Sequence, residues 1–406
     1  MSLAEIKITV HRSIADIAPA EWNACANPAR LDAPDIAADG LYQGERHNPF
    51  LSHAFLHALE ASGSVGARAG WAPFHLAIEN ERKKIVAIAP CYLKSHSQGE
   101  YVFDHAWADA YERAGGDYYP KLQVSVPFTP VNGRRLLVAG ENDAGSRAAL
   151  IAGLRALRQQ AGASSVHVTF PTPQEWHALG DAGFLQRTGQ QFHFFNSGYA
   201  NFEEFLSELA SRKRKAIRKE REAARRDGIE IEWITGRDLT EAHWDAFFAF
   251  YMDTGSRKWG RPYLTRKFFS LVGGTLADRI LLVMAKRAGR YIAGALNFIG
   301  DDALYGRNWG AIEEHPLLHF EVCYYQAIEF GITRRLRRVE AGAQGEHKLA
   351  RGYRPVTTYS AHDFADPRMT RAIGDYLKSE RQHVEAAIDF YGEHVPFRKV
   401  PEPQCR

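Results

Sequence analysis

Hydrophobic and polar residues alternate in a similar way in two distant stretches of the chain. Residues 75–93 (HLAIENERKKIVAIAPCYL) and 281–299 (LLVMAKRAGRYIAGALNFI) each contain two apolar runs separated by a charged turn. Runs of this length, rich in Ile, Val, Leu and Ala and bounded by a polar turn, predict paired antiparallel strands. We therefore expect a β-hairpin in each half of the chain.

The patterns that surround the two hairpins also occur in the same order, which indicates an internal repeat. Helical stretches precede each hairpin, at 48–63 in the first half and at 240–258 and 265–274 in the second. After each hairpin come a strand ending in Trp (101–107 and 303–309) and an amphipathic helix (146–161 and 317–333). A short strand (164–170 and 336–342) and a short helix ending in Gly-aromatic (175–184 and 346–353) complete each half. Trp107 would match Trp309, and Gly183 would match Gly352, with each glycine in the left-handed conformation that ends a helix.

This element order is that of the GNAT acyltransferase fold, present twice in tandem. The expected fold class is mixed α/β. We predict an N-terminal GNAT-like domain at 1–198, a C-terminal GNAT-like domain at 199–370 with a basic N-terminal helix, and a C-terminal helix and tail at 371–406.

Composition changes this prediction little. The chain has 406 residues and a 45% hydrophobic content, as in a packed globular protein. No apolar run is long enough for a membrane span, and Glu5 and Lys7 interrupt the region that an export signal needs to be apolar. The four cysteines are far apart, without the spacing of a metal site. These features predict a cytoplasmic protein.

Positive charge is concentrated in residues 211–226, SRKRKAIRKEREAARR. Apolar residues at helical spacing predict one amphipathic helix over 205–226, with its packed stripe formed by Phe205, Leu209, Ala216, Ile217, Ala223 and Ala224. The basic face, including Lys213, Lys215, Arg218 and Lys219, has three interpretations. It is a solvated surface, a contact for the phosphates of tRNA or another polyanion, or a peripheral contact with anionic lipid.

Three segments carry a resemblance to a known family: 205–222, 103–131 (FDHAWADAYERAGGDYYPKLQVSVPFTPV) and 339–356 (VEAGAQGEHKLARGYRPV). They resemble predicted bacterial N-acyltransferases of the peptidoglycan biosynthesis or recognition type, which are similar to the FemABX aminoacyltransferases. The chain has no room for the helical hairpin that many Fem ligases contain. The resemblance implies transfer of an aminoacyl group to an amine of a peptidoglycan-precursor-type acceptor, and it places Lys348 near the donor phosphate.

The donor is expected to be a co-substrate, with no permanently bound cofactor. GNAT enzymes that use acyl-CoA bind its pyrophosphate at a glycine-rich turn that begins a helix. The matching turn, GAIEEHPLLHF at 310–320, has Glu313 and Glu314 instead, and carboxylates repel a pyrophosphate. Aminoacyl-tRNA is therefore ranked ahead of acyl-CoA. An acyl-CoA-dependent acetyltransferase acting on a small amine, and a non-catalytic GNAT pair that binds cell-wall peptide or nucleic acid, stay open.

The second-half segment 340–353 is the predicted transfer site. Glu346 and His347 could accept the proton of the attacking ammonium, and Glu340, at the end of a buried strand, needs a partner, for which Arg307 is the candidate. The alternative is structural, with Glu346 capping a helix and Lys348 exposed. Further side chains expected to bind substrate in this half are Arg307, Asn308, Trp309 and Arg351.

The first-half run 104–119 combines carboxylates with aromatic rings, which suits an amine or a sugar-peptide acceptor. The candidate residues are Asp104, His105, Trp107, Asp109, Tyr111 and Tyr118. A purely structural loop is the alternative. His53, His57 and Glu60 have helical spacing but lack the HExxH pattern, so no metal site is predicted.

Overall fold

The computed structural model describes residues 7–28, 47–140, 144–258, 262–343 and 345–398. Its contacts divide the chain into two compact units. Unit 1 comprises Met1–Gly189, Tyr263–Ala277 and Thr357–Glu385, and unit 2 comprises Gln190–Pro262, Asp278–Val356 and Ala386–Arg406. Both units are therefore discontinuous in sequence. The predicted ranges 1–198, 199–370 and 371–406 describe a tandem repeat along the chain, and that division stays a prediction.

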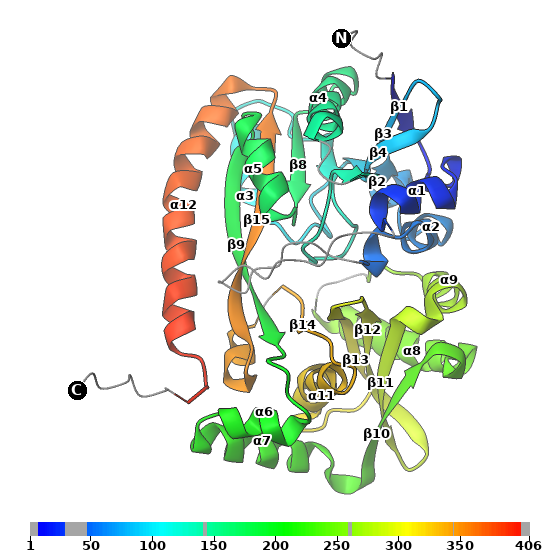
Figure 1. Cartoon of the computed structure of the whole chain (residues 1–406), viewed down its shortest axis with the longest axis vertical. Helices are drawn as coiled ribbons and strands as arrows, with labels where there is room; N and C mark the ends of the chain where they lie inside the picture. Colours follow the sequence, from blue (N-terminus) through cyan, green and yellow to red (C-terminus); the bar gives the residue numbers. More distant parts are fainter. Residues whose placement is uncertain (1–6, 29–46, 141–143, 259–261, 344, 399–406) are drawn as a thin grey trace, which may run out of the picture. The chain divides into compact units, whose positions relative to one another are not determined.

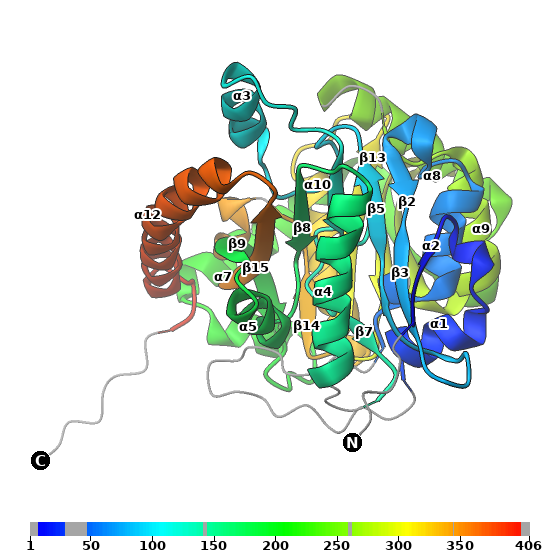
Figure 2. The ribbon, with the colours of Figure 1, turned by 90° about the horizontal axis from the view of Figure 1, so that it is seen from above.

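Unit 1 contains two groups of strands and the helices that cover them. Its elements are β1 (Lys7–His11), α1 (Pro19–Ala26), α2 (His53–Ala61), β2 (Trp71–Pro73), β3 (His75–Glu79), β4 (Ile85–Ala89), β5 (Cys91–Lys94), α3 (His105–Arg113), β6 (Lys121–Val124), β7 (Leu137–Val138), α4 (Ala144–Gln160), β8 (Ser165–Thr169), α5 (Pro173–Asp181) and α9 (Arg266–Leu276). The strand orders are β1-β3-β4-β7 and β15-β8-β6-β5-β2, where β15 is Arg354–Phe364. Strands β6 and β8 pair in parallel. Figure 2 shows α4 over one face of the second group, with α3 on its other side.

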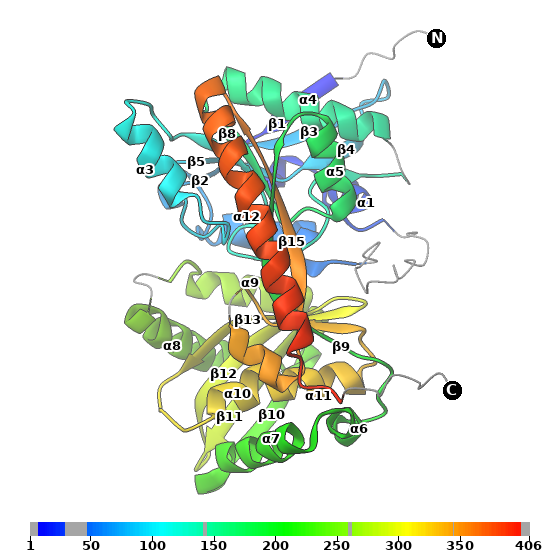
Figure 3. The same ribbon diagram turned by 90° about the vertical axis from the view of Figure 1, so that its left-hand side faces the viewer.

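Unit 2 is built around a sheet with the order β10-β11-β12-β13-β14-β9. Its elements are β9 (Leu185–Phe195), α6 (Phe202–Glu208), α7 (Ser211–Ala224), β10 (Ile229–Thr235), α8 (Glu241–Lys258), β11 (Ile280–Arg287), β12 (Arg290–Ile299), β13 (Ala303–Ala311), α10 (Leu318–Phe320), a π-helical segment (Glu321–Tyr325), α11 (Gln326–Thr333), β14 (Arg338–Glu340) and a 3₁₀ helix (Glu346–Arg351). Helices α8 and α11 flank this sheet (Figures 1 and 3).

Two long elements cross the boundary between the units along the chain. The boundary at Gly189 falls inside β9, and the boundary at Val356 falls inside β15 (Arg354–Phe364). The last helix, α12 (Pro367–Glu393), also begins in unit 1 and ends in unit 2. None of the helices in the described ranges combines the length and apolar character that a membrane span requires.

The structure confirms the mixed α/β class and most of the repeated order of elements. Both predicted hairpins are present as β3–β4 and β11–β12. Each half then contains a parallel strand pair, β6–β8 and β13–β14, as expected where a helix connects neighbouring strands of a GNAT fold. Gly183 and Gly352 have the predicted left-handed φ values of 87° and 89°.

One predicted strand is wrong. Residues 105–113 form helix α3, so Trp107 lies on a helix whereas Trp309 lies on strand β13. The side chains of Trp107 and Tyr111, four residues apart, pack in one cluster with Phe364, Ile373 and Leu377. A helix places side chains four residues apart on one face, so both rings reach this cluster from α3. The third strand of the first half is β6 instead.

Candidate functional site

In unit 2 the parallel strands β13 and β14 separate partway along. Their last paired residues are Tyr305 and Glu340, whereas β13 continues to Ala311. After Glu340 the chain turns through Gly342, whose φ is +78°. A Cβ on Gly306 would lie 3.3 Å from the Glu340 carbonyl oxygen, so the two backbones are still close at this point. Side chains that follow β14 therefore lie where the two strands separate.

Glu340 is a buried carboxylate with an incomplete set of partners. Arg338 Nε donates to its Oε1 at 2.8 Å, while its buried Oε2 has no hydrogen-bond partner among the described residues. His193 Nε2 lies 3.8 Å from that Oε2. Burial raises the pKa of Glu340 and lowers the pKa of His193 well below its usual value.

The hydrogen-bonded partner of Glu340 is thus Arg338, and the prediction of Arg307 was incomplete. Arg338 lies two residues before Glu340 on the same strand, so both side chains project from one face of the sheet. Arg307, half-buried on β13, also acts to lower the pKa of Glu340. Asn308 and Trp309 follow it on β13 and are half-buried as well.

Lys348 is buried, which contradicts the structural alternative of an exposed lysine. Only 1% of the residue is exposed, and its Nζ donates to the Gly342 carbonyl oxygen at 3.0 Å. It has no carboxylate partner in the described part of the chain. Burial lowers the pKa of Lys348 to about 8. An ammonium group with a single backbone acceptor can still bind an anionic oxygen.

The other residues of this segment point elsewhere. Glu346 accepts a hydrogen bond from Tyr391 Oη at 2.5 Å, so its carboxylate is turned toward α12. His347 Nε2 lies 3.0 Å from Tyr324 Oη, and burial lowers the pKa of His347. Arg351 is buried, stacks over the Phe320 ring at 3.5 Å and donates to Glu220 Oε2 of α7 at 2.8 Å.

The basic stretch forms two helices, where one was predicted. Leu209 is extended, and Ala210 N donates to the Pro396 carbonyl oxygen, which separates α6 from α7. Ile217 and Ala224 are buried as predicted, but Ala216 is exposed. The predicted packed stripe was therefore wrong at Ala216.

The charges of α7 divide into two groups. Arg221 and Arg225 bind the buried Glu321, and Arg218 pairs with Glu203 at 2.5 Å. The second group is exposed and has no ion-pair partner within the described ranges; its members are Arg212, Lys213, Lys215 and Lys219. One side of the helix is thus anchored on unit 2, and the other presents unpaired positive charge.

The carboxylates in the turn before α10 have ionic partners. Glu313 accepts from Arg287 at 2.7 Å and lies 3.0 Å from His315 Nε2, while Glu314 pairs with Arg257 at 3.2 Å. The described residues 310–318 therefore present acidic side chains rather than a glycine-rich turn at the start of the helix.

In unit 1 the structure brings together only part of the predicted 104–119 set. Tyr118 Oη donates to Asp104 Oδ2 at 2.8 Å, and Trp107 is buried nearby on α3. His105 and Asp109 are exposed on α3, and Tyr111 Oη donates to Asp366 at 3.4 Å. The acidic and aromatic residues of this run therefore do not form a single surface.

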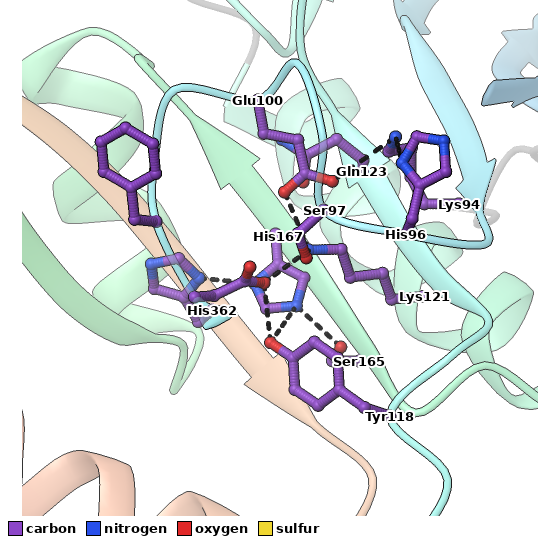
Figure 4. Close-up of polar contacts among 12 residues, drawn as sticks. Lys94, His96, Ser97, Glu100, Tyr118, Lys121, Gln123, Ser165, His167 and His362 are labelled. Atoms are coloured by element: carbon purple, nitrogen blue, oxygen red, sulfur yellow. Dashed lines mark hydrogen bonds and ion pairs between the residues drawn. The ribbon is translucent and has the colours of Figure 1, made fainter. Parts of the chain in front are cut away.

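Asp104 belongs to a buried ionic network that the sequence patterns did not predict. Figure 4 shows Lys94, Glu100 and Lys121 of this network. Lys121 Nζ donates to Asp104 Oδ2 at 2.5 Å, to Glu100 Oε2 at 2.8 Å and to Ser97 Oγ at 2.8 Å. Lys94 Nζ lies 3.7 Å from Glu100 Oε1 and 3.6 Å from the centre of the Trp71 ring. Burial lowers the pKa of Lys94 to about 7 and raises that of Glu100 to about 7.

Two buried histidines extend this network. Tyr118 Oη lies 3.5 Å from His167 Nε2, and His167 Nδ1 lies 2.7 Å from His362 Nδ1. Ser165 and Ser360 contact the remaining ring nitrogens. One Nδ1 must carry a proton and donate it in a hydrogen bond to the other Nδ1, because two unprotonated nitrogens at this distance would repel. Burial lowers the pKa of His167 to about 3 and that of His362 well below its usual value.

The comparisons define the family. A model of the FemAB-like family, described as peptidoglycan biosynthesis/recognition, matches residues 13–399, and the chain belongs to this family. No curated protein matches the chain.

Several solved structures are similar to the chain. One is FemX, with 11% identity, 76% of this chain and 92% of that chain covered, and a TM-score of 0.48. Another is L-PGS from Bacillus licheniformis, with 11% identity, coverage of 82% and 98%, and a TM-score of 0.49. A tandem GNAT protein from the clavulanic acid biosynthesis pathway has 11% identity, coverage of 89% and 99%, and a TM-score of 0.45.

Proposed function

We propose that the protein is an N-acyltransferase that transfers an aminoacyl group from aminoacyl-tRNA to the amine of a peptidoglycan-precursor-type acceptor. Membership of the FemAB-like family supports the peptidoglycan context. The observation that carries the proposal is the pair of incompletely partnered buried charges, Glu340 and Lys348, beside the point where β13 and β14 separate.

Each of these groups matches one need of amide formation. The acceptor nitrogen attacks the ester carbonyl carbon, the new C–N bond forms, and the bond to the ribose oxygen breaks. Glu340, with its raised pKa and open Oε2, accepts the proton that the nitrogen loses. Lys348 binds a donor phosphate or stabilises negative charge on the ester oxygen, and it protonates the departing ribose oxygen.

The exposed charges of α7 support aminoacyl-tRNA as the donor. Four positive charges on this face have no ionic partner within the described ranges: Arg212, Lys213, Lys215 and Lys219. Such charges can neutralise the phosphates of a nucleic-acid backbone. Helix α7 is tied to the candidate site through the bond from Arg351 to Glu220. With this donor, the protein would act in the cytoplasm.

The decisive experiment compares donors at a fixed acceptor. Purified protein is incubated with a peptidoglycan stem peptide and either radiolabelled aminoacyl-tRNA or acetyl-CoA, and amide formation is followed by mass spectrometry. We expect product with aminoacyl-tRNA, and at least tenfold less with Lys348→Met. Lys84→Met, an exposed lysine in the β3–β4 hairpin, is the control and should retain full activity. Product from acetyl-CoA alone would contradict the proposed donor, and no product from either would favour a binding protein.

A further inference from the structure

One face of the unit-1 sheet carries polar side chains across four neighbouring strands, although it is buried. Strand pairing places Lys94 opposite Lys121, Tyr92 opposite Gln123, Gln123 opposite His167, and His167 opposite His362. The intervening positions, Cys91, Leu122, Val124, Val166, Val168 and Ala361, belong to the apolar core on the other face. A sheet face that contacts water is usually polar, because water solvates its side chains. This face does not contact water, since Lys94, Lys121 and Gln123 are each 0% exposed.

Two ammonium groups on paired positions of this face depend on carboxylates from one overlying segment. Lys94 and Lys121 would repel each other without Glu100 and Asp104, both of which come from residues 95–104. The fit is incomplete, because Glu100 Oε1 and Asp104 Oδ1 are buried without a hydrogen-bond partner in the described ranges. The lysines are therefore neutralised by acids that use only part of their hydrogen-bonding capacity.

The strands that carry these lysines, together with residues beside them, have further buried polar atoms that lack partners in the described ranges. They are Trp71 Nε1, Tyr92 Oη, Gln123 Oε1 and Ser125 Oγ. Trp71 and Tyr92 are in edge-to-face contact, Tyr92 pairs with Gln123 across the strands, and Ser125 follows Gln123 by two residues. Buried polar groups are normally hydrogen-bonded, so a local group of donors without acceptors indicates a place for a ligand or water. Three of these four groups can donate, which favours an acceptor-rich ligand.

The overlying segment has features of a cover that can move away. Gly99 and Tyr101 have left-handed φ values of +81° and +60°, and Phe103 is 59% exposed. Tyr101 stores strain in that conformation, which a rearranged segment would release. Figure 4 shows Glu100 reaching the lysines from this segment, while Lys121, Gln123 and His167 lie on the strands beneath.

We infer that this face is a binding site for a ligand with a phosphate or carboxylate group, and that Glu100 and Asp104 occupy the place of its anionic oxygens when no ligand is bound. The ligand would contact Lys94 and Lys121 and would use the unpartnered donors of Trp71 and Tyr92, which lie beside Lys94. This site is separate from the proposed transfer chemistry at Glu340, so its test does not depend on activity.

Isothermal titration calorimetry with inorganic pyrophosphate and with malonate tests the inference and distinguishes the two oxyanions. Asp104→Asn removes a competing negative charge, and we expect it to bind one probe at least tenfold more tightly than wild type does. Adding Lys121→Met to Asp104→Asn should abolish that binding. Glu81→Gln, an exposed carboxylate in the β3–β4 hairpin, is the matched control and should leave affinity unchanged. Equal affinities of Asp104→Asn and wild type for both probes would overturn the inference.

A second measurement uses the wild-type chain and covers the case in which Asp104→Asn fails to fold. Binding of the effective probe should release residues 95–104 and accelerate chymotryptic cleavage after Tyr101 or Phe103. A cleavage rate that does not rise with either probe would show that Glu100 and Asp104 are permanent structural partners of the lysines.

Discussion

Lys121 of unit 1 and Lys348 of unit 2 are both buried lysines beside a parallel strand pair, but their surroundings differ. Lys121 has two carboxylates and a hydroxyl within 2.8 Å. Despite burial, which acts to lower it, those carboxylates raise the pKa of Lys121. Lys348 has one backbone carbonyl, and burial lowers its pKa to about 8. In the ligand-free chain the charge of Lys121 is therefore neutralised, and Glu100 and Asp104 would have to move before an anionic group could replace them. Lys348 can receive an anionic group without displacing a carboxylate from the described part of the chain.

The largest expected effect is a contrast in stability when both lysines are changed to methionine. Lys121→Met leaves Glu100 and Asp104 buried without their cation and should lower the free energy of unfolding by about 3–5 kcal/mol. Lys348→Met removes an ammonium that has no carboxylate partner in the described ranges, so it should leave stability unchanged or raise it. Urea denaturation of both variants measures the difference. Equal losses would mean that Lys348 is also structural.

The next prediction tests whether Glu340 of unit 2 acts as the proton acceptor. Glu340→Gln keeps the size of the side chain and its contact with Arg338 but removes the proton acceptor. We expect kcat to fall about 10²-fold or more, with little change in KM. The rise of kcat with pH through the raised pKa of Glu340 should disappear in the variant. A change in KM alone would assign Glu340 to substrate binding.

The paired histidines of unit 1 predict a pH dependence of stability. Their pKa values are lower in the folded chain, so below about pH 6.5 the unfolded chain binds protons that the folded chain does not. Their contribution is therefore fully present above that pH and is lost as pH falls toward about 3. Between pH 6.5 and 5, His362→Gln should reduce the slope of unfolding free energy by roughly 1 kcal/mol per pH unit. Surface His177→Gln is the control. An unchanged slope would place these histidines in a hydrated environment.

The smallest expected effect concerns the exposed face of α7. Neutralising Lys213, Lys215 and Lys219 should weaken tRNA binding and reduce its logarithmic salt slope by about 0.7–0.9 for each phosphate that the variant no longer neutralises. Arg237→Gln, at the exposed 3₁₀ turn after β10, serves as the control for general charge. If wild-type binding of tRNA shows no dependence on salt, this face of the helix is only solvated.

Periodicity and repetition were enough to predict most of the fold. The apolar runs of the two hairpins and the left-handed glycines Gly183 and Gly352 follow from local physics, and the structure confirms them. The strand predicted at 101–107 failed because a run that contains Asp104, His105 and Trp107 has no clear period. The contacts of Trp107 with residues more than 250 positions later decided its conformation.

The buried network of unit 1 has a signal in the sequence. Polar residues alternate with apolar ones in two short strands: Lys121 and Gln123 in β6, and Ser165, His167 and Thr169 in β8. Alternation of this kind is normally assigned to a solvated face. Only pairing with β5 and β15 shows that the polar positions are buried and adjacent, and pairing between distant strands cannot be read from a single sequence.

The break between α6 and α7 depends on the far end of the chain. Pro396 accepts from Ala210 N, Arg398 N donates to the Glu208 carbonyl oxygen, and Leu209 forms an isolated bridge with Phe397. Residues 396–398 thus hold the segment between α6 and α7 in an extended conformation, which fixes where the basic helix begins. A protein shortened to end at residue 394 would keep every charge of α7 and every residue of the candidate site. It would lose the contacts of residues 396–398 with residues 208–210, and with them the constraint on the direction of α7.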